Sequence, residues 1–363
     1  MKKFFVVALM LFYGVHLNAQ KPDSLKTLKY IRVEYLHGPF YDHRKYSVAV
    51  DMHTADAVSV SYMFQTRGDK LWHKLYGFPK TGFSLTAANF NNNEVLGKTI
   101  TMAAFSEFYF LNVKDCSAYF NSSAGCAYVT KSFDAQTNNM NMFVGSKFCA
   151  YFRFGIGFDL LKSKKVSYNL GLNFVHWSDG CTKLPNLGLN VLMLNVGAAY
   201  RINQSFKKPT VNDIPAFEKK FKFETSAAAS LRESGYPDGP NYCVINLNTG
   251  VYRLRSHKFR YGAGFDYFRD PSVKFYYLRN NESFSKSDYN SLGVFASAGM
   301  AFGKLTTDFN FGYYLITSEQ TDGNLYHRLS FNYHITDRIF AKIGLRTYFM
   351  KAQCIEFGTG ISF

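Results

Sequence analysis

Apolar and polar residues alternate along most of this chain. In the second half the alternation runs through 221–232, 242–254, 258–269, 290–302, 304–315, 325–335, 338–349 and 352–363. In the first half it divides into eight further stretches, at 30–37, 56–66, 81–90, 98–111, 116–131, 143–161, 165–177 and 188–202. Because successive side chains of a β-strand point to opposite faces, each stretch predicts a strand with one apolar face and one small or polar face.

The connections between these stretches alternate in length. In the second half, tight connections lie at 255–257, 303 and 336–337, and longer polar loops lie at 234–241, 270–289 and 316–324. Short turns on one side and long loops on the other are typical of outer-membrane barrels. The last strand ends in Phe363, as the last strands of bacterial outer-membrane barrels commonly do. We therefore expect an all-β fold, an antiparallel transmembrane β-barrel in the outer membrane.

About sixteen strands can close in two ways. One sixteen-stranded barrel and two eight-stranded barrels both fit the length of the chain. Unpaired strand edges are not tolerated in lipid, so every edge strand must find a partner in either case. We favour the single barrel, because two linked barrels in one chain are rare, and keep two eight-stranded barrels as the alternative. The expected parts are a barrel half at 20–205, a polar connector at 206–220 and a second barrel half at 221–363.

The first residues read as a secretory signal. Lys2 and Lys3 precede an apolar run over 4–15, and the small residue Ala19 follows. This order predicts a signal peptide at 1–19 that is cleaved before Gln20. An exported chain of alternating strands is expected in the outer membrane.

Composition and charge agree with such a barrel. Aromatic residues make up 18% of the chain, while its mean hydropathy is only −0.17, which is expected when lipid-facing and lumen-facing residues alternate. The net charge is +16, but the basic residues are dispersed over loops and polar strand faces, so we expect no nucleic-acid partner. The histidines lack metal-ligand spacing and glycine-rich phosphate loops are missing, so no metal and no cofactor are expected. Outer-membrane lipids are the expected partners, and no disulfide pairing can be read from the six cysteines.

Candidate chemistry lies at the end of one strand. From Val166 onward the even positions are apolar, which places His176 and Ser178 next to each other on the apolar face. A serine hydroxyl needs an adjacent base to become a nucleophile, and residues i and i+2 of a strand are about 7 Å apart, much of which a histidine ring can span. The backbone after Ser178, including Gly180, offers N–H donors for a developing oxyanion. The alternative is that His176 and Trp177 are interfacial girdle residues and Ser178 a loop cap.

Several segments of the first half resemble a known family. They are Trp72-His73-Lys74-Leu75-Tyr76-Gly77-Phe78-Pro79, Thr81-Gly82-Phe83, Leu96-Gly97, Gly125-Cys126-Ala127-Tyr128, His176-Trp177-Ser178-Asp179-Gly180 and Leu184-Pro185-Asn186-Leu187-Gly188-Leu189-Asn190. Together they resemble the acyloxyacyl hydrolase or lipid A deacylase family, particularly its longer members from Bacteroidetes-type bacteria. The resemblance covers roughly 30–202, and the carboxy-terminal half lies outside it. It implies an outer-membrane esterase that removes an ester-linked acyl chain from lipid A, the lipid part of lipopolysaccharide, or from a related outer-leaflet lipid.

The resemblance also implies roles for individual residues. His176 corresponds to the general base, Ser178 to the nucleophile, and Asn190 to the third position, where the family has a glutamate. Asp179 stands where better-studied members have an asparagine suspected of helping the oxyanion, so Asp179 and Gly180 are the candidate supports. An asparagine can still fix the tautomer of a histidine by accepting its N–H bond. The expected protein is a carboxylic ester hydrolase; the alternative is a non-enzymatic channel or structural barrel that has lost the catalytic acid.

Overall fold

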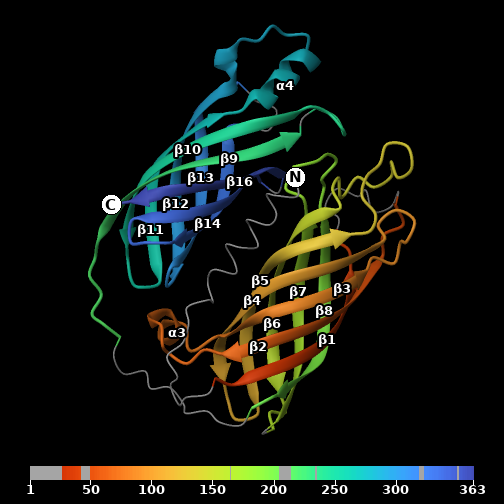
Figure 1. The fold of residues 1–363 in the computed structure, drawn as a ribbon, viewed down its shortest axis with the longest axis vertical. Helices are drawn as coiled ribbons and strands as arrows, with labels where there is room; N and C mark the ends of the chain where they lie inside the picture. The colour runs from red at the N-terminus through yellow and green to blue at the C-terminus, as the bar shows by residue number, and fades with distance from the viewer. Residues whose placement is uncertain are drawn as a thin grey trace.

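The chain forms two closed antiparallel barrels of eight strands each (Figure 1). The computed structural model describes residues 27–41, 50–163, 165–203, 214–233, 235–318, 323–349 and 351–363. The expected signal peptide at 1–19 and residues 206–213 of the expected connector lie outside the described residues.

The first barrel closes where its first strand pairs with its eighth. β1 lies antiparallel to β8, with Tyr35 opposite Val196. Its strands are β1 (Lys29–Pro39), β2 (Thr54–Gln65), β3 (Lys80–Asn89), β4 (Lys98–Asn112), β5 (Cys116–Val129), β6 (Phe148–Leu160), β7 (Val166–Ser178) and β8 (Leu189–Arg201). The short helix α3 (Leu71–Leu75) lies in the connection between β2 and β3.

The second barrel closes in the same way. β16 lies antiparallel to β9, with Phe357 opposite Ala229. Its strands are β9 (Phe221–Glu233), β10 (Asn241–Leu254), β11 (Phe259–Arg269), β12 (Asn290–Phe302), β13 (Leu305–Ile316), β14 (Leu325–His334), β15 (Ile339–Tyr348) and β16 (Lys351–Ser362). The loop between β11 and β12 holds the 3-10 helix η1 (Pro271–Val273), the helix α4 (Lys274–Arg279) and the 3-10 helix η2 (Lys286–Tyr289). None of the helices in the described residues is long and apolar enough to cross a membrane.

The sixteen-stranded barrel that the sequence favoured is wrong, and the alternative of two eight-stranded barrels is the observed fold. Each half pairs its own first and last strands, so neither has an open edge to offer the other. The strand expected at 143–161 begins only at Phe148, because Phe143 and Val144 are buried in an apolar cluster with Trp177 and other side chains. These apolar residues pack inward from a loop, and periodicity alone does not distinguish such a loop from a strand.

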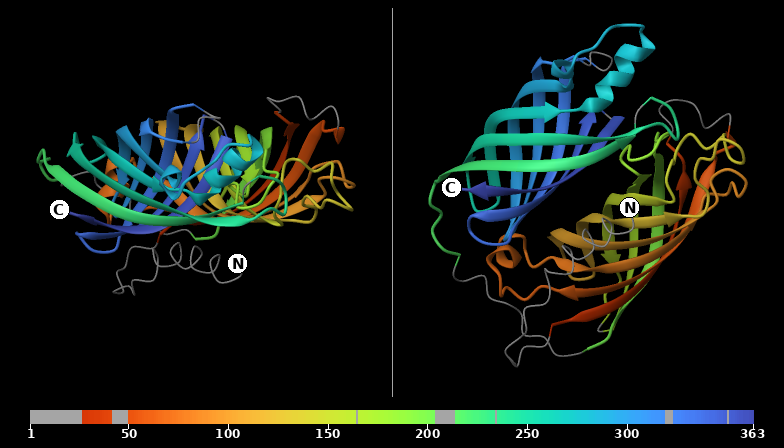
Figure 2. Two further views of the ribbon diagram at one scale, coloured as in Figure 1. Left: turned by 90° about the horizontal axis from the view of Figure 1, so that it is seen from above. Right: turned by 45° about the horizontal axis from the view of Figure 1, so that its top comes forward.

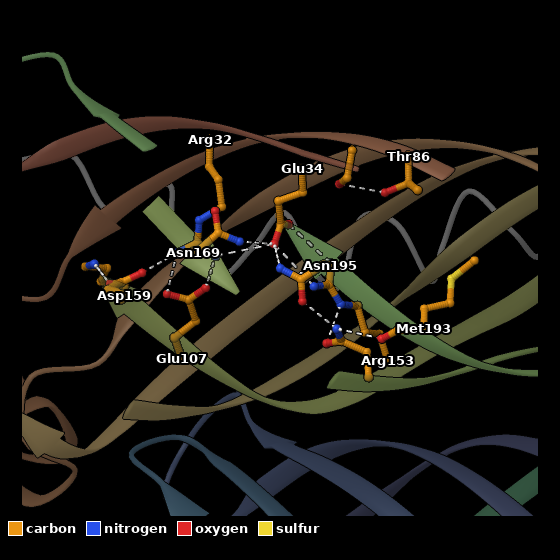
Figure 3. A network of polar contacts seen from close by, with 12 residues as sticks. Arg32, Glu34, Thr86, Glu107, Arg153, Asp159, Asn169, Met193 and Asn195 are labelled. Carbon is orange, nitrogen blue, oxygen red and sulfur yellow. Dashed lines mark hydrogen bonds and ion pairs between the residues drawn. The ribbon is translucent and has the colours of Figure 1, made fainter. Parts of the chain in front are cut away.

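Both barrels are apolar outside and filled with paired charges inside. On the outer face of the first barrel Leu194 is 60% exposed. Figure 3 shows the lumen network of this barrel, in which Arg32 bonds Glu107 and Arg153 approaches Glu34 at 3.3 Å. In the second barrel, buried pairs include Arg328 with Asp266 at 2.7 Å and Arg260 with Glu224 at 2.7 Å. Eight strands enclose an interior just wide enough for side chains, and buried charges require such partners. These filled interiors do not favour the channel alternative.

The two barrels lie side by side and touch near both ends (Figures 1 and 2). We call the end with the connections after odd-numbered strands the loop end, and the opposite end the turn end. At the turn end, the ring of Tyr76 stacks on Phe302 with centroids 4.6 Å apart, and its hydroxyl donates to the carbonyl of Ala301 at 3.0 Å. At the loop end, the segment between β7 and β8 rests on β9 and β16.

Candidate active site

His176 and Asn190 face each other across two neighbouring strands. β7 and β8 pair in a register that sets His176 opposite Asn190, and both side chains lie on the outer face, as the sequence predicts. The Nδ1 atom of His176 is 2.6 Å from the Oδ1 atom of Asn190. Because an amide oxygen only accepts, this contact places the imidazole proton on Nδ1 and leaves Nε2 with a free lone pair. This is the tautomer that a general base requires.

Trp177 fixes the end of strand β7 from the opposite face. Its indole points into the barrel, packs edge-on against Phe90 with centroids 5.3 Å apart, and donates from Nε1 to the hydroxyl of Thr101 at 3.3 Å. Adjacent side chains of a strand point to opposite faces, so anchoring Trp177 inside holds His176 outside. The backbone of Gly188 lies close to the imidazole. Its φ is +75°, and a Cβ there would lie 2.6 Å from Cε1 of His176. Only glycine fits this approach without strain.

Ser178 is covered, although it lies on the outer face. Its side chain is 6% exposed. The hydroxyl accepts from Nδ2 of Asn186 at 2.9 Å and from the backbone N–H of Gly180 at 3.1 Å, and Oδ1 of Asn186 lies within reach at 3.1 Å. Within the described residues, the side-chain hydrogen bonds of Ser178 run to these two partners and none runs to His176. The structure therefore brings His176 to Asn190, and Ser178 to Asn186 and Gly180.

Asn186 is the site residue that sequence reasoning missed. Its Oδ1 accepts the backbone N–H of Asp179 at 3.2 Å, which orients the amide so that Nδ2 faces Ser178. The sequence signal for it is the Pro-Asn-x-Gly motif at 185–188, which contributes to the family resemblance. In the structure its asparagine contacts Ser178, and its glycine contacts His176.

Within the described residues, the carboxyl of Asp179 forms no hydrogen bond with His176 or Ser178. It is buried near the thiol of Cys149 and the backbone amides of Ser146, Cys181 and Lys183, without a hydrogen bond of good geometry. Burial raises the pKa of Asp179 to about 7, and the nearby amides only partly offset this. Asp179 contacts the site through its backbone N–H, which donates to Oδ1 of Asn186.

The described residues hold no group of three His, Cys, Asp or Glu side chains placed to bind a metal ion. The site brings together an imidazole, a serine hydroxyl and amide donors.

Comparison with protein families gives two matches. The model of lipid A 3-O-deacylase (PagL) matches residues 56–199, and the model of the acyloxyacyl hydrolase C-terminal domain matches residues 219–363. The chain belongs to the acyloxyacyl hydrolase family. The resemblance expected from 30–202 is confirmed, whereas the expectation that the carboxy-terminal half lies outside it is wrong. Membership of this hydrolase family agrees with the predicted location in the outer membrane.

Solved structures similar to this acyloxyacyl hydrolase are outer-membrane proteins. The outer membrane enzyme PagL is 14% identical, with 46% of this chain and 97% of that chain covered and a TM-score of 0.32. Neisserial surface protein A is 11% identical, with 48% and 97% covered and a TM-score of 0.31. The Acinetobacter baumannii protein Omp33 is 7% identical, with 94% and 99% covered and a TM-score of 0.18. No curated protein matches the chain.

Proposed function

We propose that this protein is an outer-membrane esterase that removes an ester-linked acyl chain from lipid A, with Ser178 as nucleophile and His176 as base. The observation that carries the proposal is the 2.6 Å contact between Nδ1 of His176 and Asn190, because it leaves Nε2 free to accept a proton beside Ser178. The family supports a deacylase, and the outward position of the residues supports a substrate that lies in the membrane.

The proposed reaction begins with a turn of the serine side chain. Rotation about χ1 moves Oγ from Asn186 and Gly180 toward Nε2 of His176, which takes the hydroxyl proton as Oγ attacks the ester carbon. His176 then donates that proton to the alcohol that leaves, and the acyl group stays on Ser178. His176 then deprotonates a water molecule that attacks the acyl-enzyme, and returns the proton to Oγ of Ser178 as the fatty acid is released.

Two donors become available as the hydroxyl turns. The N–H of Gly180 and the Nδ2 of Asn186 point at the resting position of Oγ, 3.1 and 2.9 Å away. Once Oγ has moved, both groups can donate to the carbonyl oxygen of the ester as its negative charge develops. Aimed donors in a covered site are the usual source of oxyanion stabilisation, and each contributes on the order of 10²-fold or more in rate.

The acyl chain is proposed to lie along the outer wall of the barrel. Beyond Asn190, the outward side chains Leu192 and Leu194 are exposed and apolar, and Leu172 continues the same surface on β7. A substrate in the outer leaflet can place its ester at the loop end of the barrel and its acyl chain against these leucines without leaving the bilayer.

The test is mass spectrometry of lipid A from cells that carry the native protein, Ser178→Ala, His176→Ala or no protein. Loss of one ester-linked acyl chain is expected with the native protein and with the control Ser167→Ala, a serine at the opposite end of β7. Both site variants should leave lipid A intact while the folded barrels remain in the outer membrane. Deacylation by Ser178→Ala would refute the serine mechanism, and unchanged lipid A with the native protein would favour the structural-barrel alternative.

A further inference from the structure

The segment that covers Ser178 belongs to the first barrel but rests on the second. We call residues 179–188 the active-site loop. The backbone N–H of Leu184 donates to the carboxylate of Glu233 at the end of β9, and the thiol of Cys181 donates to the carbonyl of Ala352 on β16 at 2.8 Å. Gly180 lies against Ile355, since a Cβ on that glycine would be 2.3 Å from Cγ1 of Ile355.

These contacts hold the two donors that face Ser178. Gly180, whose N–H points at the serine hydroxyl, packs directly on Ile355. Asn186, whose Nδ2 points at the same oxygen, follows Leu184 by two residues, and Leu184 is bonded to Glu233. The Glu233 side chain is only 2% exposed, so its bond to the loop is shielded from competition with water. Gly180 is therefore contacted directly by the neighbouring barrel, while Asn186 lies between Leu184, which is bonded to that barrel, and Gly188, which is bonded to Phe143 of its own barrel.

A loop of this length needs such support to be precise. Holding each residue in one conformation costs backbone entropy, which the loop's bonds to its own barrel, such as that of Gly188 to Phe143, offset only in part. Rigid strands that hold its backbone reduce this freedom, and catalytic donors must be held close to their productive positions to be effective. The stacking of Tyr76 on Phe302 at the turn end fixes the second barrel against the first at another point.

We propose that the second barrel is a working part of the active site, with Glu233 and Ile355 as positioning residues. They act through the active-site loop, which sets Asn186 and Gly180 at Ser178. This inference rests on the proposed serine mechanism for its catalytic consequence, but the docking of the loop on the second barrel can be measured without any activity.

The kinetic experiment uses the full-length protein in detergent with purified lipid A. Glu233→Ala is expected to lower kcat by about tenfold or more with KM nearly unchanged, because the variant disturbs donors needed in the transition state. Glu233→Gln should keep most of the native kcat, since its amide oxygen can still accept from the N–H of Leu184. Ile355→Ala should lower kcat, and Ile355→Leu should preserve it. Heat-modifiable migration checks that each variant is folded.

The matched control is Asp238→Asn. Asp238 also contacts the loop, through Lys183 at 3.1 Å, but this pair is exposed and should contribute little. A folded Glu233→Ala variant with native kcat would overturn the positioning role.

The second readout is backbone hydrogen exchange of peptides from residues 179–188. Glu233→Ala should speed their exchange, while Glu233→Gln and Asp238→Asn should leave it near the native rate. Unchanged exchange in Glu233→Ala would overturn the docking itself. If the native protein shows no deacylation but the loop still depends on Glu233, the proposed function fails and the docking stands.

Discussion

His176 and Asn190 form a hydrogen-bonded pair across β7 and β8, with 2.6 Å between Nδ1 and Oδ1. The amide fixes the ring and its tautomer, but it carries no charge. When His176 takes a proton, the amide dipole of Asn190 therefore stabilises the imidazolium less than a carboxylate would.

The first prediction follows from this difference. Asn190→Glu should raise kcat, by about tenfold, because a carboxylate stabilises the imidazolium that forms during attack. Asn190→Leu removes the acceptor and should lower kcat by about 10²-fold or more. Steady-state kinetics on purified lipid A measure both. Equal or lower activity of a folded Asn190→Glu variant would show that the site is adapted to a neutral partner.

The second prediction concerns the coupling of His176 and Ser178. If they act as base and nucleophile of one step, Ser178→Ala, His176→Ala and the double variant should lose activity to nearly the same level, because removing one member already disables the other. Losses that multiply in the double variant would mean that the two residues contribute independently. The comparison requires single-turnover rates for all three variants, with the native protein measured in parallel.

The strands were predictable because their alternation is local. β12, for instance, occupies the predicted 290–302, and the outward placement of His176 and Asn190 follows from period two alone. Closure was not predictable, because the alternation that defines β1 and β8 says nothing about which strand each will pair with. Whether β8 continues to β9 or returns to β1 is decided by shear and chain geometry.

The covering of Ser178 was also beyond the sequence pattern. Period two sets its side chain outward, toward lipid, yet the active-site loop folds over it and presents Asn186. That loop has no periodicity, and its position depends on Glu233 and Ile355, which are distant in sequence. Contacts of this kind between separate barrels leave no local signal.

The third prediction concerns pH. The pKa of Asp179 is about 7 in the folded protein and about 4 in an exposed chain, so the native loop binds the proton more tightly than the opened loop does. Docking should therefore be strongest at low pH, weaken as the pH rises from about 4 to about 7, and level off above that. The nearby carboxylate of Glu233 also raises the pKa of Asp179, whereas the backbone amides of Lys183 and Cys181 lower it.

Asp179→Asn should remove this dependence. The measurement is hydrogen exchange of the 179–188 peptides in the native protein and the variant at matched pH. The intrinsic exchange rate, which itself depends on pH, then cancels in the ratio of the two measured rates. The native loop should lose protection relative to the variant between pH 5.5 and pH 8. A constant ratio over that range would show that the carboxyl of Asp179 does not titrate in the docked loop.

The last prediction tests how closely the loop must approach the base. A Cβ on residue 188 would lie 2.6 Å from Cε1 of His176, and the φ of +75° is itself unfavourable for other residues. Gly188→Ala should therefore push the imidazole from Asn190 and lower kcat by about tenfold or more, while the barrel, which closes through β1 and β8, remains folded. Gly323→Ala is the control, because it also has a positive φ, +82°, but lies in the loop between β13 and β14, where a Cβ would come no closer than 3.3 Å to another atom, the hydroxyl of Tyr348. Comparing kcat for the two variants separates backbone strain in general from displacement of His176. Native kcat in a folded Gly188→Ala protein would show that the ring tolerates the shift, and would count against the 2.6 Å contact with Asn190 as a requirement for catalysis.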